Sequence, residues 1–401
     1  MNTQTYKDIK KYLCGIIRGS EFENNVFTVG GCVRDMLMNK PIKDMDLVVS
    51  LKNGGIRFAE WLETSGYTKG SVVTYPRFGT AMFKLKEFPE EELEVVQTRT
   101  EVYTSDSRKP DTTYGTLMQD CLRRDLTINA FYEDISNDRI IDICGKSYND
   151  LKNKIIRTPC DPDQTYIDDP LRILRCVRFA NRFKWDIEAN TAISMIKNVD
   201  RLSVISKERI QDEFCKIIKD DPNGFIMLIN CQAYKYIFPN FKSEEYGFLE
   251  GIKDIKEFSI PIKLAFFGYF NPDMESDMRI LKFSVDDIKH VMDIVNLVNF
   301  LKNVKTIKDK REFCFRCKTM GRYQEVIIVA NAVRVAVHSQ WEIQPDMIGY
   351  KLPITGDDIM EFLNIEPCKK IKDVQNALMQ FVFENGAVEK EVLIREIKKF
   401  K

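Results

Sequence analysis

Histidine is scarce in this sequence, with only His290 and His338 among 401 residues. A histidine-based metal centre, as in a metal-dependent phosphohydrolase, is therefore excluded. The chain also lacks an apolar run of about 18 residues, the length that a membrane-spanning helix needs. Its first residues, MNTQTYKDIKKYL, are polar and basic and lack the apolar core of a signal peptide. We therefore expect a cytoplasmic protein without a membrane partner.

An excess of charge of either sign is also missing, because 60 basic side chains balance 60 acidic ones. This balance argues against a protein that coats nucleic acid indiscriminately. Residues 302–322 are a local exception, with eight basic side chains and only two acidic ones. Such a stretch is typical of a solvated helix face and, almost equally, of a surface that binds phosphates.

A cysteine framework is absent as well, although the chain has eleven cysteines. Scattered cysteines in a chain of this size are typical of reduced thiols in the cytosol. Cys314 and Cys317 form one C-x-x-C, which could be half of a zinc site. Because no second pair accompanies it, the face of a helix is the favoured interpretation.

Residues 27–50, FTVGGCVRDMLMNKPIKDMDLVVS, carry the first chemical motif. A run of β-formers breaks at Gly30 and Gly31, where unpaired backbone N–H groups and the missing Cβ let a triphosphate approach. Arg34 follows one helical turn later. A second apolar run carries Asp44 and Asp46, and residues i and i+2 of a strand point to the same face. The two carboxylates are therefore predicted to project together.

This carboxylate pair suits Mg²⁺, which takes hard oxygen ligands and completes its coordination with substrate phosphates. The pair therefore favours phosphoryl or nucleotidyl transfer. The alternative is a Gly-Gly turn followed by an acidic strand end, which is a common hairpin or surface feature.

The surrounding sequence predicts a small domain with an antiparallel or mixed sheet. Runs rich in β-formers, 71–75, 80–85 and 93–98, follow a helical pattern over 56–65. Residues 1–24 are predicted to form an amphipathic helix that packs on this sheet.

Residues 99–122 are polar, contain Gly and Pro and lack periodicity, so we expect a loop there. Arg123, Arg124 and Asp125 come next, with Asn129 four residues further on. Arginines can hold phosphates, while Asp and Asn can bind a ribose hydroxyl. An N-cap with flanking salt bridges would use similar residues, so this pattern alone leaves both possibilities open.

Residues 166–183, YIDDPLRILRCVRFANRF, predict a strongly amphipathic helix. Asp169 before Pro170 is a typical helix start, since Asp accepts hydrogen bonds at the N-cap and Pro suits the first turn. One arc of the helix is apolar and is predicted to enter a core. The opposite arc is too concentrated in charge to be merely solvated unless acids elsewhere meet it. It holds Arg172, Arg175, Arg178 and Arg182.

The motifs GG-C-V-R-D, K-D-M-D-L-V and R-R-D-x-T-x-N-A, followed by the acid-x-x-Arg unit of Asp169 and Arg172, resemble those of the class II CCA-adding enzymes and bacterial poly(A) polymerases. The resemblance covers residues 26–218 strongly and about the last 50 weakly. It implies sugar and phosphate contacts from the cluster that begins at Arg123. It also makes Glu94 a candidate third carboxylate beside the metals, although an acid on the solvated face of a strand is an equal alternative.

Two further segments match this family. A flexible loop at 99–122 helps its members change from adding C to adding A. The segment 206–213 resembles the family's S-x-E-R-I-x-x-E, which we interpret as a brace for the arginine-rich helix. The tail from Leu352 is also similar, but 367–372 has Cys and Lys where relatives usually place glycines, so its contacts with RNA are in doubt.

Base selection can be argued from hydrogen-bond patterns. Cytosine and adenine both present an amino donor beside a ring-nitrogen acceptor, whereas uracil and guanine present a carbonyl beside a ring N–H. A carboxylate beside a guanidinium complements the first pair and repels the second. Asp169 and Arg172 could therefore select C and A without a template. The resemblance agrees and adds nucleotide contacts from Arg175 and Arg178, while the alternative is that Asp169 is only a helix cap.

The predicted fold is α+β, with a nucleotidyltransferase α/β head over 1–140. A helical neck with the base-reading helix over 141–220, a helical body over 221–300 and a helical tRNA-binding tail over 301–401 follow it.

The predicted reaction adds C, C and A to the 3′ end of tRNA from CTP and ATP and releases pyrophosphate. Asp44 and Asp46 would bind two Mg²⁺ ions. Helical residues beyond 200 would hold the tRNA acceptor arm by its shape and phosphates. No obligate protein partner is expected.

Three alternatives stay open. A poly(A) polymerase or a partial-tail enzyme, adding only CC or only A, would share every catalytic residue. A small-molecule nucleotidyltransferase has no need of the arginine-rich helix or the long helical tail. An inactive RNA-binding relative is expected to have lost an aspartate of the first motif, and both are present.

Overall fold

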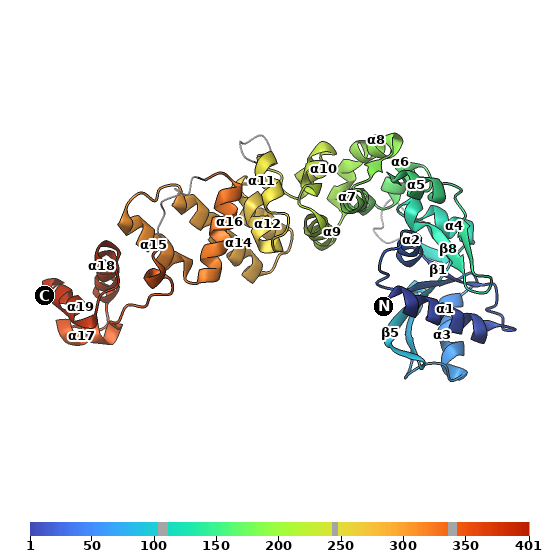
Figure 1. Cartoon of the computed structure of the whole chain (residues 1–401), viewed down its shortest axis with the longest axis horizontal. Helices are drawn as coiled ribbons and strands as arrows, with labels where there is room; N and C mark the ends of the chain where they lie inside the picture. The colour runs from blue at the N-terminus through green and yellow to red at the C-terminus, as the bar shows by residue number, and fades with distance from the viewer. Residues whose placement is uncertain (103–110, 243–247, 336–342, 401) are drawn as a thin grey trace. The chain divides into compact units, whose positions relative to one another are not determined.

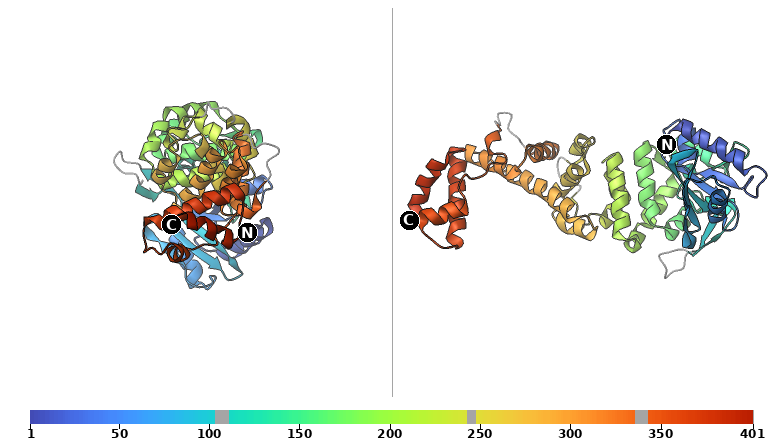
Figure 2. Two further views of the ribbon diagram at one scale, coloured as in Figure 1. Left: turned by 90° about the vertical axis from the view of Figure 1, so that its left-hand side faces the viewer. Right: turned by 90° about the horizontal axis from the view of Figure 1, so that it is seen from below.

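The computed structural model of this chain describes residues 1–102, 111–242, 248–335 and 343–400. The chain divides into two compact units. The first is formed by Met1–Asp220 and Ile226–Tyr236, and the second by Asp221–Phe225 and Ile237–Lys401. Among the described residues, all strands lie before residue 188 and belong to the first unit (Figures 1 and 2). The division into four domains stays a prediction.

A mixed sheet of seven strands, in the order β3-β4-β5-β2-β1-β8-β9, forms the base of the first unit. β2 and β5 pair in parallel, and all other neighbours pair antiparallel. This confirms the predicted mixed sheet. Its strands are β1 (Val26–Val29), β2 (Asp46–Val49), β3 (Val73–Tyr75), β4 (Thr80–Leu85), β5 (Phe88–Gln97), β8 (Phe131–Asp134) and β9 (Arg139–Asp142).

The two faces of the sheet differ because successive strand residues point to opposite sides. On one face, helices α1 (Thr3–Ile17), α2 (Gly31–Leu37) and α3 (Gly54–Thr64) enclose the larger core, to which Leu47 and Val95 belong (Figure 1). A smaller cluster on the other face contains Val48. Asp46 and Glu94 alternate with Leu47 and Val95, so they lie on this second face.

Two expectations for the first unit need correction. The helix predicted over 1–24 ends at Ile17, because Arg18 is extended and Gly19 has a φ of 76°. The loop predicted over 99–122 is instead the antiparallel pair β6 (Arg99–Val102) and β7 (Asp111–Tyr114), followed by helix α4 (Leu117–Leu122). Thr116 begins α4 with a capping box, a start signal that the polar composition concealed. Residues 103–110 of the expected loop lie outside the described residues.

The first unit continues as helices after the sheet, with one short parallel strand pair between them. The helix predicted over 166–183 is two helices, because Asp169 precedes a proline and adopts the extended backbone that this position favours. The elements are α5 (Ser147–Asn153), β10 (Ile155–Ile156), α6 (Pro162–Asp168), α7 (Leu171–Phe183), β11 (Asp186–Ile187), α8 (Ala189–Lys197) and α9 (Lys207–Asp220).

The second unit is helical throughout its described residues, so the α+β fold class is confirmed. A cluster of phenylalanines, among them Phe225, Phe241, Phe248 and Phe267, packs edge to face in its core. No helix in the described ranges is long and apolar enough to span a membrane. The helices are α10 (Gly224–Asn230, which begins in the second unit and runs into the first), α11 (Phe248–Asp254), α12 (Ile260–Tyr269), α13 (Met274–Ile280), α14 (Val285–Leu301), α15 (Ile307–Cys317), α16 (Met320–Ala332), α17 (Gly356–Leu363), α18 (Lys369–Asn385) and α19 (Lys390–Ile397).

Gly55 tests the packing of α3 on the sheet. A Cβ at this position would lie 2.8 Å from the carbonyl oxygen of Gly79 and 2.9 Å from the Cα of Val96. Because backbone must shift, Gly55→Ala should lower the free energy of unfolding by about 1–3 kcal/mol in urea unfolding. Gly15→Ala in α1 is the control, since nothing lies within 4 Å, and it should be stabilising by about 0.5–1 kcal/mol. Equal effects of the two substitutions would contradict this packing.

Candidate active site

The turn between β1 and α2 opens the site. Gly30 has a φ of 79° and a ψ of −126°, a conformation that is essentially restricted to glycine. Gly31 then begins α2. A Cβ on Gly30 would lie 3.5 Å from Nη1 of Arg124, so the guanidinium of Arg124 lies against this turn. The structure thus brings the Gly-Gly motif and the second motif together.

The acidic pair is placed differently from the prediction. Asp46 is the first residue of β2, whereas Asp44 precedes the strand. The expected strand geometry is wrong for Asp44, because in the β1–β2 register its partner would be Gly31, where the chain has already turned into α2. Glu94 lies directly opposite Asp46 in the parallel pair of β2 and β5.

These acids act on one another electrostatically. Desolvation by the surrounding protein, followed by the charge of Glu94, raises the pKa of Asp46 to about 6; Arg124 opposes this shift and Asp44 adds to it. The side chain of Asp46 nevertheless reaches solvent. A bound cation would relieve the repulsion, and Mg²⁺ commonly takes only one or two protein carboxylates. The residues fit such an ion, although the described residues contain no group of three side chains that could hold a metal by themselves.

Arg123 and Arg124 share one buried carboxylate. Nη2 of Arg123 lies 2.6 Å from Oδ1 of Asp120, and Nη2 of Arg124 lies 3.0 Å from its Oδ2. Tyr132 on β8 donates to the same Oδ2 at 2.6 Å. Although burial raises it, the two guanidinium groups lower the pKa of Asp120 to about 2. The sequence-based prediction does not include Asp120 or Tyr132, but an acid three and four residues before two arginines, as at the end of a helix, is a recognisable signal.

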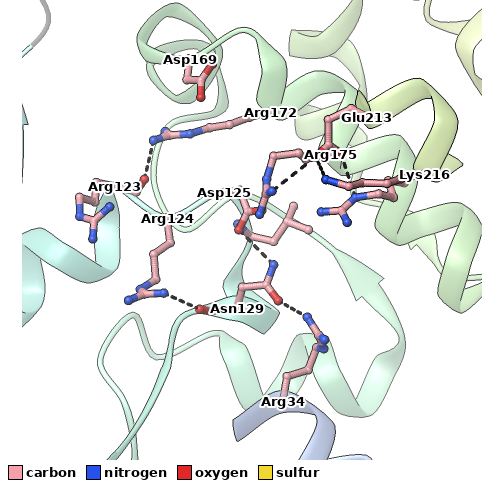
Figure 3. Close-up of polar contacts among 12 residues, drawn as sticks. Arg34, Arg123, Arg124, Asp125, Asn129, Asp169, Arg172, Arg175, Glu213 and Lys216 are labelled. Carbon is pink, nitrogen blue, oxygen red and sulfur yellow. Dashed lines mark hydrogen bonds and ion pairs between the residues drawn. The ribbon is translucent and has the colours of Figure 1, made fainter. Parts of the chain in front are cut away.

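Asp125 links the second motif to α7. Its Oδ2 lies 2.6 Å from Nη2 of Arg175, and its Oδ1 accepts a hydrogen bond from the amide of Asn129 at 3.0 Å (Figure 3). Burial raises the pKa of Asp125, but Arg175 and Asn129 together hold it well below its usual range. The carboxylate therefore stays charged in the folded protein.

Arg34 is buried in the structure, although the first motif predicts that it contacts the triphosphate. Its Nη1 donates to Oδ1 of Asn129 at 2.5 Å, and its Nε donates to Asp35 at 2.9 Å. The guanidinium also lies 5.2 Å from the ring centroids of Phe179 and Phe183 on α7. Arg34 thus orients Asn129 in this structure, and its direct contact with triphosphate stays a prediction.

Acids do meet the arginine row of α7. Glu213 on α9 lies 2.9 Å from Arg178 and 3.7 Å from Arg175, and Arg209 lies 3.0 Å from Asp169. The interpretation of segment 206–213 as a brace is therefore confirmed.

The start of α7 brings the predicted base-reading residues together with the second motif. Nη2 of Arg172 donates to the carbonyl oxygen of Arg123 at 2.6 Å (Figure 3). The Oδ1 of Asp169 accepts from the N–H of Leu171 at 3.2 Å, so Asp169 also helps to begin the helix.

The basic stretch 302–322 is largely engaged within the second unit. Lys308 pairs with Glu384 at 2.8 Å, and Arg311 donates to the carbonyl of Glu384 at 2.7 Å near the end of α18. Arg316 pairs with Glu312 at 2.6 Å on its own helix. Much of this charge therefore holds helices together, and its role in binding phosphates stays a prediction. Both cysteines of the C-x-x-C are buried on α15, as the helical-face interpretation predicts.

Two segments of the chain match known protein families. Residues 26–157 match the sequence model of the poly A polymerase head domain, and residues 185–245 match that of the probable RNA and SrmB-binding site of polymerase A. Over these two segments the chain is therefore similar to the tRNA nucleotidyltransferase and poly(A) polymerase family.

Named relatives within this family extend the match. The chain is similar to the CCA-adding enzyme of Ligilactobacillus salivarius, with 29% identity over 409 aligned positions, covering 96% of this chain and 94% of that relative. It is 36% identical over 206 positions to the mitochondrial CCA tRNA nucleotidyltransferase of Candida glabrata, covering 47% of this chain and 38% of that relative.

Solved structures of family members share the fold. The Bacillus stearothermophilus CCA-adding enzyme in complex with CTP superposes with a TM-score of 0.70, at 18% identity, over 100% of this chain and 98% of that one. The Thermotoga maritima CCA-adding enzyme complexed with tRNA-CCA superposes with a TM-score of 0.68, at 19% identity, over 98% and 95%. At these identities the likeness establishes the fold.

Asp125 gives a pH-dependent test of this ion-paired site. Its pKa is lower folded than unfolded, so its ionised form stabilises the fold above about pH 4, and this stabilisation is lost as the pH falls below that value. Asp125→Asn should lower the free energy of unfolding at pH 7 by about 3 kcal/mol, and the difference from the wild type should narrow below pH 4. Denaturant unfolding across pH 3 to 8 measures it. The exposed Asp8→Asn on α1 is the control and should change stability by no more than about 0.5 kcal/mol. A difference that grows in acid would refute the pairing.

Proposed function

We propose that this chain is a template-independent nucleotidyltransferase that adds C, C and A to the 3′ end of tRNA from CTP and ATP, with release of pyrophosphate. The observation that carries the proposal is the 2.6 Å bond from Arg172 to the carbonyl of Arg123. It joins the base-reading helix to Arg123, whose neighbour Arg124 lies against Gly30. Relatives described as CCA-adding enzymes support the same activity.

Asp44 and Asp46, with Glu94 nearby, would hold two Mg²⁺ ions. When bound, such ions lower the pKa of the primer 3′-hydroxyl and stabilise the charge on the departing pyrophosphate. The raised pKa of Asp46 has burial as its main cause, but the charges of Glu94 and Asp44 add to it, and a bound cation would relieve their repulsion.

The protein's own residues bind and orient the nucleotide. Arg124, beside the Gly30 turn, and its neighbour Arg123 would hold the triphosphate. Asp125 and Asn129 would bind the ribose, since a carboxylate has further lone pairs and an amide has a second hydrogen beyond the bonds that fix them in place. Arg175 holds Asp125 for this task.

Base selection falls to Asp169 and Arg172. The carboxylate would accept from the amino group of cytosine or adenine, while the guanidinium would donate to the adjacent ring nitrogen. Arg209 pairs with this carboxylate at 3.0 Å. Uracil and guanine would place a carbonyl against the carboxylate, which is repulsive. Arg178, paired with Glu213, would support the nucleotide from the next turn of α7.

Primer extension tests the proposed reaction. Purified protein with Mg²⁺ is given tRNA transcripts that end before CCA, after C or after CC, each with single labelled nucleoside triphosphates and then with their mixture. We expect C on the first two transcripts, A only on the third, and arrest at CCA. Unlimited addition of A would instead identify a poly(A) polymerase, the alternative favoured by the description of the matched head domain. Addition of CC alone would identify a partial-tail enzyme, and no incorporation would refute nucleotidyl transfer to tRNA.

Asp44→Ala and Asp46→Ala test the metal assignment. Each should lower the rate of transfer by about 1,000-fold, equivalent to about 4 kcal/mol of barrier, because the carboxylates that hold Mg²⁺ are lost. The shift in unfolding midpoint that Mg²⁺ produces in the wild type should disappear. Glu60→Ala, an exposed acid on α3 beneath the opposite face of the sheet, is the control and should keep both properties. Retained transfer in the aspartate variants would remove the assignment.

Asp169→Ala and Arg172→Ala test base selection. Their kcat/KM ratio for CTP over UTP on a transcript lacking CCA should fall about tenfold or more, because the edge-specific hydrogen bonds are lost. Arg182→Ala removes an exposed arginine of the same helix and serves as the control with unchanged selectivity. If all three variants kept the ratio of the wild type, the hydrogen-bond explanation would be wrong.

A further inference from the structure

We propose that Asp120 is a positioning residue for the transfer reaction, whose buried carboxylate holds Arg123 and Arg124 in the orientation that binds the triphosphate of the incoming nucleotide. This inference rests on the proposed function. It assigns a role to a residue that would not itself touch the nucleotide.

The geometry around Asp120 is that of a hub. Its side chain has no exposed surface, and each of its two oxygens serves a different arginine, at 2.6 Å for Arg123 and 3.0 Å for Arg124. The backbone N–H of Arg99 donates to Oδ1 at 3.2 Å, and the hydroxyl of Tyr132 donates to Oδ2 at 2.6 Å. One carboxylate thus fixes α4, the start of β6 and strand β8 relative to one another.

The arginines that Asp120 holds extend toward the reacting groups. Nη1 of Arg124 lies 3.5 Å from the position that a Cβ on Gly30 would occupy, so its guanidinium faces the Gly-Gly turn. The backbone carbonyl of Arg123 accepts the bond from Arg172. Asp120 therefore contacts the residues that would bind the triphosphate and that contact the base-reading helix, without reaching either itself.

Electrostatics explain why a buried carboxylate is needed here. Two adjacent guanidinium groups repel each other, and in the absence of ligand they would separate toward solvent. A shared carboxylate removes this repulsion and fixes both side chains before the nucleotide arrives, so binding does not have to order them. The stacking of Arg124 on the ring of Tyr132, at 5.3 Å from its centroid, fixes the same guanidinium from a second direction.

The test compares nucleotides that differ only in their phosphates. Equilibrium binding of CTP and of CMP to the full-length protein is measured with Mg²⁺ and without tRNA. Asp120→Asn keeps the shape of the side chain but removes its charge. This substitution should lower the affinity for CTP by about 10- to 100-fold, which is the usual effect of removing a group that orients a ligand-binding side chain. The affinity for CMP should fall by no more than about threefold. CMP lacks the β- and γ-phosphates, so its remaining contacts are with other residues.

Glu133→Gln is a matched control. Glu133 is the next residue after Tyr132 on β8, it is also buried, and it also accepts from a tyrosine hydroxyl and a cation, those of Tyr6 and Lys10. It faces the opposite side of the sheet. The control should leave the ratio of CTP to CMP affinity unchanged, even where it lowers the unfolding midpoint.

Tyr132→Phe provides a second variant that keeps the ring. It removes one donor to Asp120 and should lower the CTP to CMP affinity ratio in the same direction but by less, so the inference stays testable if Asp120→Asn does not fold. An unchanged ratio in both variants, or an equal loss of CTP and CMP, would overturn the positioning role. The same ratio change in Glu133→Gln would overturn it as well. Wild-type protein that binds CTP but does not extend tRNA would refute the proposed function, while the binding comparison would still decide the role of Asp120.

Discussion

The pairing of guanidinium groups with buried carboxylates is the interaction on which the rest of the first unit depends. Asp125 on the sheet side meets Arg175 on α7 at 2.6 Å, and Glu213 on α9 meets Arg178 at 2.9 Å. A buried charge without a partner is costly, so each arginine of this layer requires its acid to be in place. The orientation of α7 on the sheet, and hence the position of Arg172, follows from these pairs as much as from the apolar contacts beneath them.

This arrangement explains how one site could serve two bases. The side chains that would read the base are fixed by contacts that exist without a nucleotide, Asp169 by Arg209 and Arg172 by the carbonyl of Arg123. At Asp46, by contrast, burial and then the nearby charge of Glu94 disfavour the ionised carboxylate and raise its pKa. Side chains that are held in place before the base binds, next to carboxylates that would bind a cation, suit a transferase that works without a template.

Much of this could be predicted from the sequence, for identifiable reasons. The helical period separates the arginines of α7 from Ile173 and Val177. The strand period predicts that Asp44 and Asp46 share a face, but only Asp46 lies in the strand, and Glu94 is suggested by the family resemblance alone. Local start signals differ in how easily they can be recognised. Asp169 before Pro170 is identified from the sequence as a helix start, but the helix that ends at Asp168 is not separated from it in the prediction. The capping box at Thr116, within a polar stretch, is missed. The hub at Asp120 depends on Tyr132 in a separate strand, a contact that only the folded chain makes.

The decisive measurement is a double-mutant cycle on Asp125 and Arg175, measured as kcat/KM for the addition of C to a tRNA transcript that lacks CCA. If the pair holds the site, Asp125→Asn and Arg175→Gln should each lower kcat/KM by about tenfold or more, and the double variant should be little worse than the poorer single one. Losses that simply multiply would show that the two residues act independently and would contradict a site built on their pairing.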